Sequence, residues 1–466
     1  MLTSLPHALR CHSRHWLAPL VLTLTGAGLT LPATAAPHMI SGGSGHVQVL
    51  DGDGSVWVWG YNKYGTVGDG STIEASPNAQ TRPRKATLTG VVAIASGQGA
   101  SFAVTEAGTV WSWGYGYLGL GAYEGKTVPT QVAGLSNVQQ LASGLYHTLA
   151  LKRDGTLVAW GNNSRGAVGD GSTEHRALPV ALALSGVKAI AANGHSLALK
   201  NDGTVWAWGE NNRGQAGGVA GQHPSTPTQI AGLSDVKAIA AGVLHSVALK
   251  NDGTVWSWGH GIARGDGTMT DTAVPVRANI DNVTAIAAGD SFTLALREDG
   301  TVWTFGVNAY TQTGSTALPV PGQVAGLTGV RSIGASFGHR VVILADGSVH
   351  SWGMNDVGQL GNGQAGGYVN TPAAVVGATS GTLSLQSATD PKADVDRLFN
   401  WAESAFPALF TAHVASSYIE HYYVRCYSSG SCLGEAAGKV YLYDGTLTEV
   451  GTVSQLLSTY AIPAGF

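Results

Sequence analysis

The chain has 466 residues, of which 44% are hydrophobic and 12% are charged, and this composition excludes an intrinsically disordered protein. The formal net charge is −4 and no block of basic residues is present, so we predict no nucleic-acid partner. The 66 glycines follow no Gly-X-Y period, which excludes collagen and indicates many tight turns between short strands.

The N-terminal segment has the order of a cleaved secretory signal. Two arginines precede an apolar run over 16–31, and small residues follow, the last of them Ala35. We predict cleavage between Ala35 and Ala36, which makes 1–35 a signal peptide and the mature protein secreted or periplasmic. No other segment is apolar enough to span a bilayer, so we expect no stable membrane insertion once the signal is removed.

A dipeptide of an aromatic residue and glycine then recurs seven times. Its spacing of 47 to 54 residues is typical of repeated supersecondary units. Each unit holds four short strand-like runs, clearest at 236–242, 245–249 and 254–258, and the fourth run is opened by a proline. The aromatic positions are Trp59, Trp113, Trp160, Trp208, Trp258, Phe305 and Trp352.

Turn signals separate the runs within each unit. In six units Asp-Gly stands between the second and third runs, which predicts a hairpin there. Proline has no amide hydrogen to donate, so we expect the fourth run to be the outer edge strand of its sheet. The hairpin glycines are Gly54, Gly155, Gly203, Gly253, Gly300 and Gly347, and the prolines are Pro83, Pro129, Pro179, Pro227, Pro275, Pro319 and Pro372.

The third run of each unit is apolar on both faces. In the fourth unit Trp206 and Trp208 point to one face, whereas Val205 and Ala207 point to the other. Such a sheet needs cover on both sides, and a closed ring of like sheets supplies it. We therefore predict an all-β fold over 36–377, a seven-bladed β-propeller of four-stranded blades. A parallel β-helix needs a shorter coil and no hairpin inside each unit.

The repeat resembles that of a known family. Residues 242–259, with Gly-x-x-His-Ser followed by Asp-Gly-Thr-Val-Trp-x-Trp-Gly, and the Asn-x-x-Gly-x-x-Gly of 355–361 are similar to the regulator of chromosome condensation repeat. The resemblance covers about residues 38–377 and recurs in all seven units. It implies the propeller fold, and with the predicted signal it points to an exported bacterial member of that family.

A second domain is predicted after the propeller. The stretch 378–393 is rich in small and polar residues and reads as a linker, and 394–466 is predicted to be a small α+β module. We expect helices at 394–410 and 453–460 and strands at 418–427, 439–443 and 447–451. Cys426 and Cys432 are predicted to form a disulfide across a hairpin. The module is similar to a tail found on exported Gram-negative proteins.

Five histidines recur once per unit, each eight residues before a hairpin glycine. Because they fall on separate blades, we expect packing or turn-bonding roles for them and no metal site. No cofactor is predicted either, since the glycine-rich stretches 67–72 and 168–173 precede no helix and contain no Lys. The histidines are His46, His147, His195, His245 and His339.

The candidate binding residues lie in the loops that follow each Trp-Gly. Tyrosine and arginine on a rigid scaffold are typical of protein interfaces. The alternative is that these tyrosines pack over neighbouring loops and the arginines are solvated. The candidates are Tyr61, Tyr64, Tyr115, Tyr117, Arg165, Arg213, Arg264 and Tyr310.

Three functions follow from these patterns. The first hypothesis is an exported binding protein whose loops hold a protein or a glycan, resembling in architecture the exported bacterial propeller that inhibits β-lactamases. The second is guanine-nucleotide exchange on a small GTPase, which the family resemblance implies and the predicted signal peptide disfavours. The third is an enzyme acting on polysaccharide, for which no catalytic residue can be named; two carboxylates about 5 to 9 Å apart in a deep pocket would favour it.

Overall fold

The structure is a computed structural model that describes residues 39–307 and 317–385 in full, together with the backbone of five strands between 413 and 452. Contacts divide the chain into one unit of Ala36–Ser387 and another that contains Met1–Ala35 and Ala388–Phe466. The predicted signal peptide, Tyr310 and the two predicted helices of the tail lie outside the described residues. No helix in the described part of the chain has the length and apolarity that a membrane span requires.

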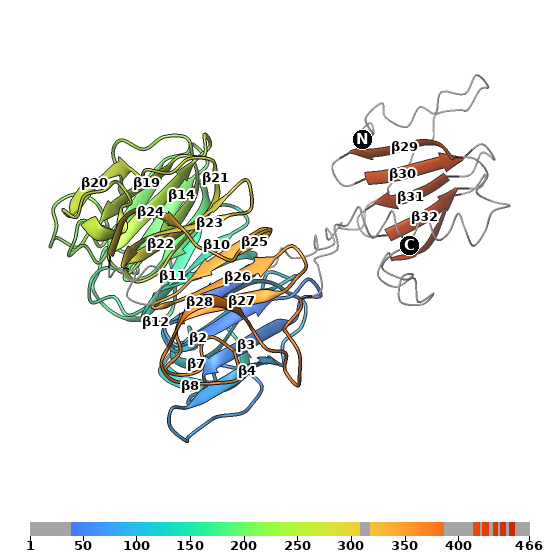
Figure 1. The fold of residues 1–466 in the computed structure, drawn as a ribbon, viewed down its shortest axis with the longest axis horizontal. Helices are drawn as coiled ribbons and strands as arrows, with labels where there is room; N and C mark the ends of the chain where they lie inside the picture. Colours follow the sequence, from blue (N-terminus) through green and yellow to red (C-terminus); the bar gives the residue numbers. More distant parts are fainter. Residues whose placement is uncertain are drawn as a thin grey trace. The chain divides into compact units, whose positions relative to one another are not determined.

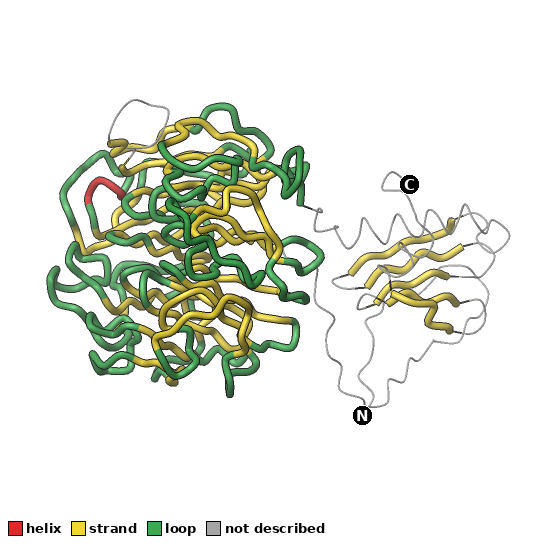
Figure 2. Tube along the Cα trace, turned by 90° about the horizontal axis from the view of Figure 1, so that it is seen from below, coloured by secondary structure: helices red, strands yellow, loops and turns green. Residues whose placement is uncertain are grey.

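Seven four-stranded antiparallel sheets make up the first unit, and they are called blades 1 to 7 in chain order (Figure 1). The only helical segment in the described part of this unit is the 3₁₀ turn η2 (Gly261–Ala263), drawn red in Figure 2. Blade 1 contains β1 (Met39–Gly42), β2 (His46–Leu50), β3 (Val56–Tyr61) and β4 (Ala79–Lys85), and blade 2 contains β5 (Val91–Ser96), β6 (Ala100–Thr105), β7 (Val110–Tyr117) and β8 (Tyr123–Gln131). Blade 3 contains β9 (Val138–Ser143), β10 (His147–Lys152), β11 (Leu157–Gly161) and β12 (Arg176–Ala181), blade 4 contains β13 (Val187–Ala192), β14 (His195–Lys200), β15 (Val205–Gly209) and β16 (Thr228–Gln229), and blade 5 contains β17 (Val236–Ala241), β18 (His245–Lys250), β19 (Val255–Gly259) and β20 (Thr272–Arg277). Blade 6 contains β21 (Val283–Ala288), β22 (Phe292–Arg297), β23 (Val302–Val307) and β24 (Ala317–Gln323), and blade 7 contains β25 (Val330–Ala335), β26 (His339–Leu344), β27 (Val349–Met354) and β28 (Tyr368–Ala374).

The blades close into a ring. The first strands of successive blades contact one another, and β1 of blade 1 contacts β25 of blade 7. Within each blade the strands are hydrogen-bonded in chain order, so the fourth strand is an edge of its sheet. The first strands therefore line the centre of the ring and the fourth strands its outside. The predicted seven-bladed propeller of four-stranded blades is confirmed.

The recurring prolines lie in or directly before the fourth strands, yet they do not open them as predicted. Strand β4, for example, begins four residues before Pro83. Its pairing with β3 runs from Gly60 opposite Gln80 to Val58 opposite Arg84, which leaves Pro83 inside a bulge. A proline fits there because a bulged residue on an edge strand donates no amide hydrogen bond to the neighbouring strand.

The six Asp-Gly turns have one geometry. Glycine, and not aspartate, takes the left-handed conformation, with φ between +75° and +80°. The aspartate instead accepts hydrogen bonds from the residue two positions later. In blade 3 the Asp154 Oδ1 accepts from the amide of Thr156 at 3.0 Å and from its hydroxyl at 2.6 Å. These bonds hold the pKa of Asp154 below its ordinary value.

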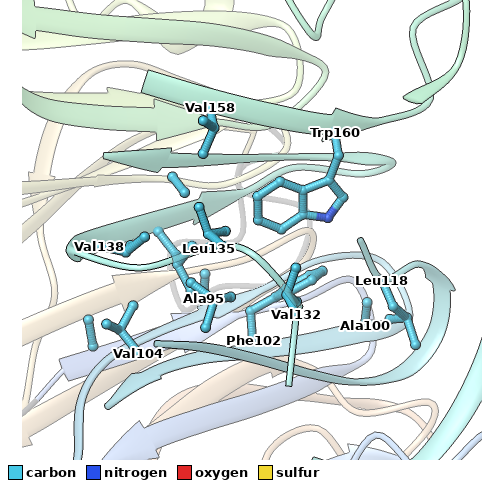
Figure 3. Close-up of a cluster of buried hydrophobic side chains, with 14 residues drawn as sticks. Ala95, Ala100, Phe102, Val104, Leu118, Val132, Leu135, Val138, Val158 and Trp160 are labelled. Carbon is cyan, nitrogen blue, oxygen red and sulfur yellow. The ribbon is translucent and has the colours of Figure 1, made fainter. Parts of the chain in front are cut away.

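Both faces of each blade are buried against neighbouring blades, as predicted. Between blades 2 and 3 the fully buried Trp160 meets Phe102 edge-on, with ring centroids 5.9 Å apart, beside Val132 (Figure 3). In blade 4, Trp208 packs with side chains of blade 3, whereas Val205 on the opposite face packs with side chains of blade 5. The cores of the propeller are therefore the seams between blades.

The seam between blades 7 and 1 extends beyond the predicted boundary at residue 377. Isolated bridges pair Ser348 with Ser384 and Val376 with Thr382, and Leu383 and Leu385 are buried in one cluster with Trp59. Part of the predicted linker 378–393 thus belongs to the propeller. Two leucines in an otherwise polar stretch carried too weak a pattern to predict this, because only the neighbouring seam makes them core residues.

The second unit contains one five-stranded antiparallel sheet. Its strands are β29 (His413–Ile419), β30 (Tyr422–Tyr427), β31 (Cys432–Ala436), β32 (Lys439–Tyr443) and β33 (Leu447–Thr452). The single strand predicted at 418–427 is therefore wrong: its residues belong to two paired strands, and β31 was not predicted. Cys426 and Cys432 lie opposite each other in the β30–β31 register, and their disulfide stays a prediction.

Candidate binding surface

The loops after Trp-Gly gather on one face of the ring, called here the Trp-Gly face. In blades 1, 2 and 5 the residue after the glycine donates its amide hydrogen to the turn between the first two strands. The bonds join Tyr61 to the Gly45 carbonyl, Tyr115 to that of Gly99, and His260 to that of Leu244, at 2.8 to 2.9 Å. Each long loop is thereby tied to the short turn beside it, so both kinds of connection share this face.

Buried asparagines accept backbone hydrogen bonds within the long loops of blades 1, 3, 4 and 7. In blade 7 the Asn355 Oδ1 accepts from the Leu360 amide at 3.1 Å, and its Nδ2 donates to the Gln364 carbonyl at 3.2 Å. The same loop contains Gly361, where a Cβ would stand 2.8 Å from Nε1 of Trp59 in blade 1. Glycine is needed because the loop backbone lies directly on the next blade's tryptophan. This loop is therefore held by its own hydrogen bonds and by the next blade.

Five tyrosines of blades 1 and 2 form a continuous row on this face, called here the tyrosine cluster. Tyr64 and Tyr115 stack across the seam between the blades with centroids 4.6 Å apart, and Tyr61 meets Tyr64 edge-on at 6.1 Å. Tyr123 meets Tyr115 at 5.0 Å and Tyr117 at 4.9 Å, both nearly perpendicular. Tyr64, Tyr115 and Tyr123 are 37 to 54% exposed, so the row is open to solvent.

Sequence reasoning found four of these five tyrosines and missed Tyr123. That residue begins β8, six positions after Tyr117, and the strand register places it directly opposite Tyr117. Tyr146, which is 54% exposed, lies close enough to influence its titration. Burial raises the pKa of Tyr123, and the phenols of Tyr115 and Tyr117 raise it further. The hydroxyl therefore stays protonated at neutral pH and can donate a hydrogen bond.

The three predicted arginines each contact a histidine or aspartate side chain of the propeller. Arg165 Nη1 lies 2.9 Å from Nε2 of His223, and Arg213 forms an ion pair with Asp271 at 2.9 Å. Arg264 is only 4% exposed and pairs with Asp266 at 3.1 Å. The structure thus brings together four of the five predicted tyrosines and leaves the arginines apart from them, while Tyr310 lies outside the described residues. The two arginines that reach solvent belong to blades 3 and 4.

The recurring histidines are buried in the seams between blades. In four blades Nε2 is paired with a hydroxyl at the second position of the next blade's second strand, as in His195 to Ser246 at 2.6 Å. The other pairs are His46 with Ser101, His147 with Ser196, and His245 with Thr293. Burial lowers the pKa of His195 to about 3, so its imidazole is neutral. These side chains join blades and are closed to a ligand.

His339 departs from this pattern. It is fully buried, and neither of its ring nitrogens has a hydrogen-bond partner within 39–307 and 317–385. The equivalent hydroxyl position on the next blade is occupied by Val47. No group of three or more His, Cys, Asp or Glu side chains that could hold a metal ion occurs among the described residues.

Two open cavities in the described part of the ring can be compared with the requirements of carbohydrate hydrolysis. An open cavity of about 480 Å³ beside β4 contains Asp69 as its single carboxylate, and one of about 260 Å³ beside β20 contains only Asp281. Neither offers the pair of carboxylates that glycoside hydrolysis uses. On the Trp-Gly face, burial raises the pKa of Asp290, which lies near His260, but no cavity accompanies them among those described.

The seven like blades and the loops gathered on one face define a repeat propeller. Family models described as "Regulator of chromosome condensation (RCC1) repeat" match residues 53–104, 107–151, 202–249 and 346–383, and a second such model matches 138–167, 187–215, 283–312 and 330–359. Together they cover more than half of the chain. The chain belongs to the RCC1 repeat family.

Curated relatives share only part of their length with this chain. It is 32% identical over 150 residues to the ultraviolet-B receptor UVR8 of Arabidopsis thaliana, a match that covers 30% of this chain and 33% of the receptor. It is 33% identical over 157 residues to the E3 ubiquitin-protein ligase HERC2 of Homo sapiens, covering 32% of this chain and 3% of the ligase. The chain thus spans a third or less of these relatives.

Among solved structures the chain is similar to human WBSCR16. The TM-score is 0.63 at 24% identity, over 69% of this chain and 94% of that one. At this identity the likeness shows the propeller fold and nothing about activity.

Proposed function

We propose that this protein is an exported binding protein that holds a protein partner on the tyrosine cluster of its Trp-Gly face. The observation that carries the proposal is the unbroken row of Tyr61, Tyr64, Tyr115, Tyr123 and Tyr117, in which successive ring centroids lie 4.6 to 6.1 Å apart. Tyrosine supplies a large apolar area and a hydroxyl at little cost in side-chain entropy, which is why it dominates interface hot spots.

The rigidity of the surface supports binding as its role. The loops are tied to the neighbouring turns and to the next blade, so a partner would meet a surface that is already organised. The RCC1-type relative HERC2 is named as a ubiquitin-protein ligase, a protein that acts with another protein. This supports a protein, rather than a small molecule, as the ligand of the shared repeat.

The test is capture of a partner by the immobilised full-length chain from envelope and culture proteins of the producing organism. Wild type is compared with Tyr64→Ala/Tyr115→Ala/Tyr123→Ala and with Tyr368→Ala, which removes an exposed tyrosine of blade 7 outside the cluster. We expect each single truncation within the cluster to weaken binding by about 1 to 2 kcal/mol, about 5- to 30-fold.

The triple variant should lose the captured protein while the Tyr368→Ala variant retains it, and both should unfold at the wild-type temperature because the residues are exposed. Equal capture by the triple variant would overturn the role of the cluster. Retention of sugars alone would replace the protein partner by a glycan. Export is tested separately by N-terminal sequencing of the mature protein, which should begin at Ala36.

A further inference from the structure

Blade 1 carries a concentration of basic residues that the other blades lack. Arg82, Arg84 and Lys85 lie within four positions of its outer strand β4. No other fourth strand contains more than one basic residue. This cluster lies on the outside of the ring and is independent of the tyrosine cluster.

The three basic residues line the open cavity of about 480 Å³, together with Trp57, Asp69, Gln80, Pro83 and Ala378. Asp69 is the only carboxylate of the lining, and Arg84 binds it through Nε at 2.8 Å. Lys85 lies over the Trp57 ring at 4.9 Å, and its ammonium is 3.5 Å from Asp53. The lining therefore contains three cationic side chains and one carboxylate. That carboxylate is paired with Arg84, so Arg82 forms no ion pair within the lining.

The cavity lies where the two ends of the propeller meet. Arg82 donates from Nη1 to the Gly377 carbonyl at 3.1 Å, just beyond the last blade. The Gly363 amide in the last loop of blade 7 donates to the Thr81 carbonyl of β4 at 2.9 Å. One wall of the cavity thus belongs to blade 1, and Ala378 brings the end of blade 7 to the other.

We propose that this cavity binds an oxyanion group of the phosphate class and that the bound anion fastens the closure of the ring. Guanidinium groups bind phosphate oxygens through paired N–H donors, and an ammonium beside them adds a third donor. An anion held between β4 and residues 377–378 contacts both ends of the propeller only when the ring is closed. It therefore stabilises the folded state.

The experiment measures the melting temperature of the full-length chain in sodium phosphate and in sodium chloride of equal ionic strength. At about 20 mM phosphate we expect a rise of about 2 °C over chloride for wild type, since the ligand binds only the folded ring. Arg82→Gln/Lys85→Gln should lose the rise. Lys237→Gln, at an exposed position of β17 in blade 5, should keep it.

Arg82 also holds the closure directly, so its replacement could unfold the ring. Lys85→Gln alone leaves the Gly377 bond intact, and its effect is read from broadening of the phosphate ³¹P resonance by the folded protein, which should be lost or strongly reduced. No rise over chloride in wild type, or an equal rise in the Arg82→Gln/Lys85→Gln and wild-type proteins, would overturn the proposal.

The source of the phosphate group is distinguished with vesicles. Sedimentation of the wild-type chain with vesicles of phosphatidylcholine and phosphatidylglycerol, but not with phosphatidylcholine alone, would assign the site to a lipid headgroup. A phosphate-dependent rise in melting temperature without sedimentation would assign it to a soluble phosphate ester. Either assignment requires the rise in melting temperature in phosphate, and sedimentation without that rise contradicts the proposal.

Discussion

At the scale of single residues, the seams between blades are joined by an imidazole and a hydroxyl that occupy fixed positions of the repeat. In the His46, His147 and His195 pairs the hydroxyl also donates to a backbone carbonyl of the preceding blade, as Ser246 does to Gln215 at 2.8 Å. That carbonyl also accepts the indole N–H of the seam tryptophan, Trp258 in this case. The hydroxyl thus links the imidazole to a backbone carbonyl that also accepts the indole N–H, all inside an apolar seam.

The seam between blades 7 and 1 lacks only the hydroxyl of this arrangement. Among the described residues His339 has no hydrogen-bond partner, Val47 occupies the hydroxyl position, and the Gln359 carbonyl accepts the Trp59 indole N–H. We expect Val47→Thr to raise the free energy of unfolding by about 0.5 to 1.5 kcal/mol, because threonine has nearly the shape of valine and would bond both groups.

Urea unfolding at neutral pH measures this change. The control is Val49→Thr, which puts a hydroxyl into the same buried cluster at a position where the repeat places no histidine. That control should be destabilising, since the new hydroxyl is buried without a designed partner. Equal loss of stability in both variants would contradict the proposed partner for His339.

The same histidines make the fold sensitive to acid. Burial lowers the pKa of His46 and His147 to about 4 and that of His195, His245 and His339 to about 3, compared with 6.5 for the ordinary side chain. Below pH 6.5 these histidines therefore bind protons in the unfolded chain but stay neutral in the folded chain. The free energy of unfolding consequently falls as the pH falls.

Each buried histidine contributes a loss of about 1.4 kcal/mol per pH unit between the unfolded pKa and its folded pKa. We expect these five residues to leave the free energy of unfolding unchanged above about pH 7. Between about pH 6 and pH 4 they should lower it steeply. Urea denaturation at a series of pH values measures the slope. A constant free energy of unfolding from pH 7.5 to pH 5 would show that the histidines are not buried as described.

At the scale of the element, each third strand alternates its side chains between two different seams. Trp208 is fully buried against blade 3, and its indole donates to the Ala167 carbonyl at 2.9 Å. Gly169 of the preceding loop has φ of +88° and lies against the same indole. The alternation in this strand was predicted from the sequence, but the partner of Trp208 is a loop more than thirty residues earlier in the chain.

We expect Trp208→Ala to lower the free energy of unfolding by about 3 to 5 kcal/mol, because it leaves a cavity in the seam and removes the indole hydrogen bond to the Ala167 carbonyl. Chemical denaturation measures the loss. Trp206→Ala on the same face is the matched control and should cost clearly less, since Trp206 is only partly buried. A loss below about 1 kcal/mol for Trp208→Ala would argue against burial of this ring between blades.

At the scale of the whole molecule, the ring is closed by side chains and by the segment that follows the last blade. Leu383 and Leu385 are 4% and 2% exposed, and they share a cluster with Val47 and Trp59 of blade 1. All seven blades consist of consecutive strands, so no strand is exchanged between the two ends of the ring. Closure therefore depends on this packing.

A chain that ends at Gly377 should accordingly be less stable than one that ends at Ser387. Burying each leucine contributes about 1.5 to 3 kcal/mol, so we expect a deficit of about 3 to 6 kcal/mol for the shorter chain. Urea unfolding of the two truncated chains, with the full-length chain as reference, measures it. Equal free energies of unfolding for the two truncated chains would show that the propeller ends at residue 377.

Much of this architecture could be predicted because its signals are local and repeated. The spacing of Trp-Gly, the Asp-Gly turns and the two apolar faces of 254–258 each depend on neighbours in the chain, and seven copies made the pattern unambiguous. The candidate surface was predicted in part for the same reason: four of the five clustered tyrosines lie within about four residues of a Trp-Gly, whereas Tyr123 joins them only through the register of β7 and β8.

By itself, then, the sequence determined how many blades there are, where each hairpin turns and which side chains face the seams. Only the tertiary structure decided which side chains meet across a seam: His195 with Ser246, Leu385 with Trp59, Tyr64 with Tyr115. The reason is physical. Strand pattern and turn chemistry are set within a few residues, but a contact between blades depends on closing a ring of seven, which brings together residues about fifty or several hundred positions apart.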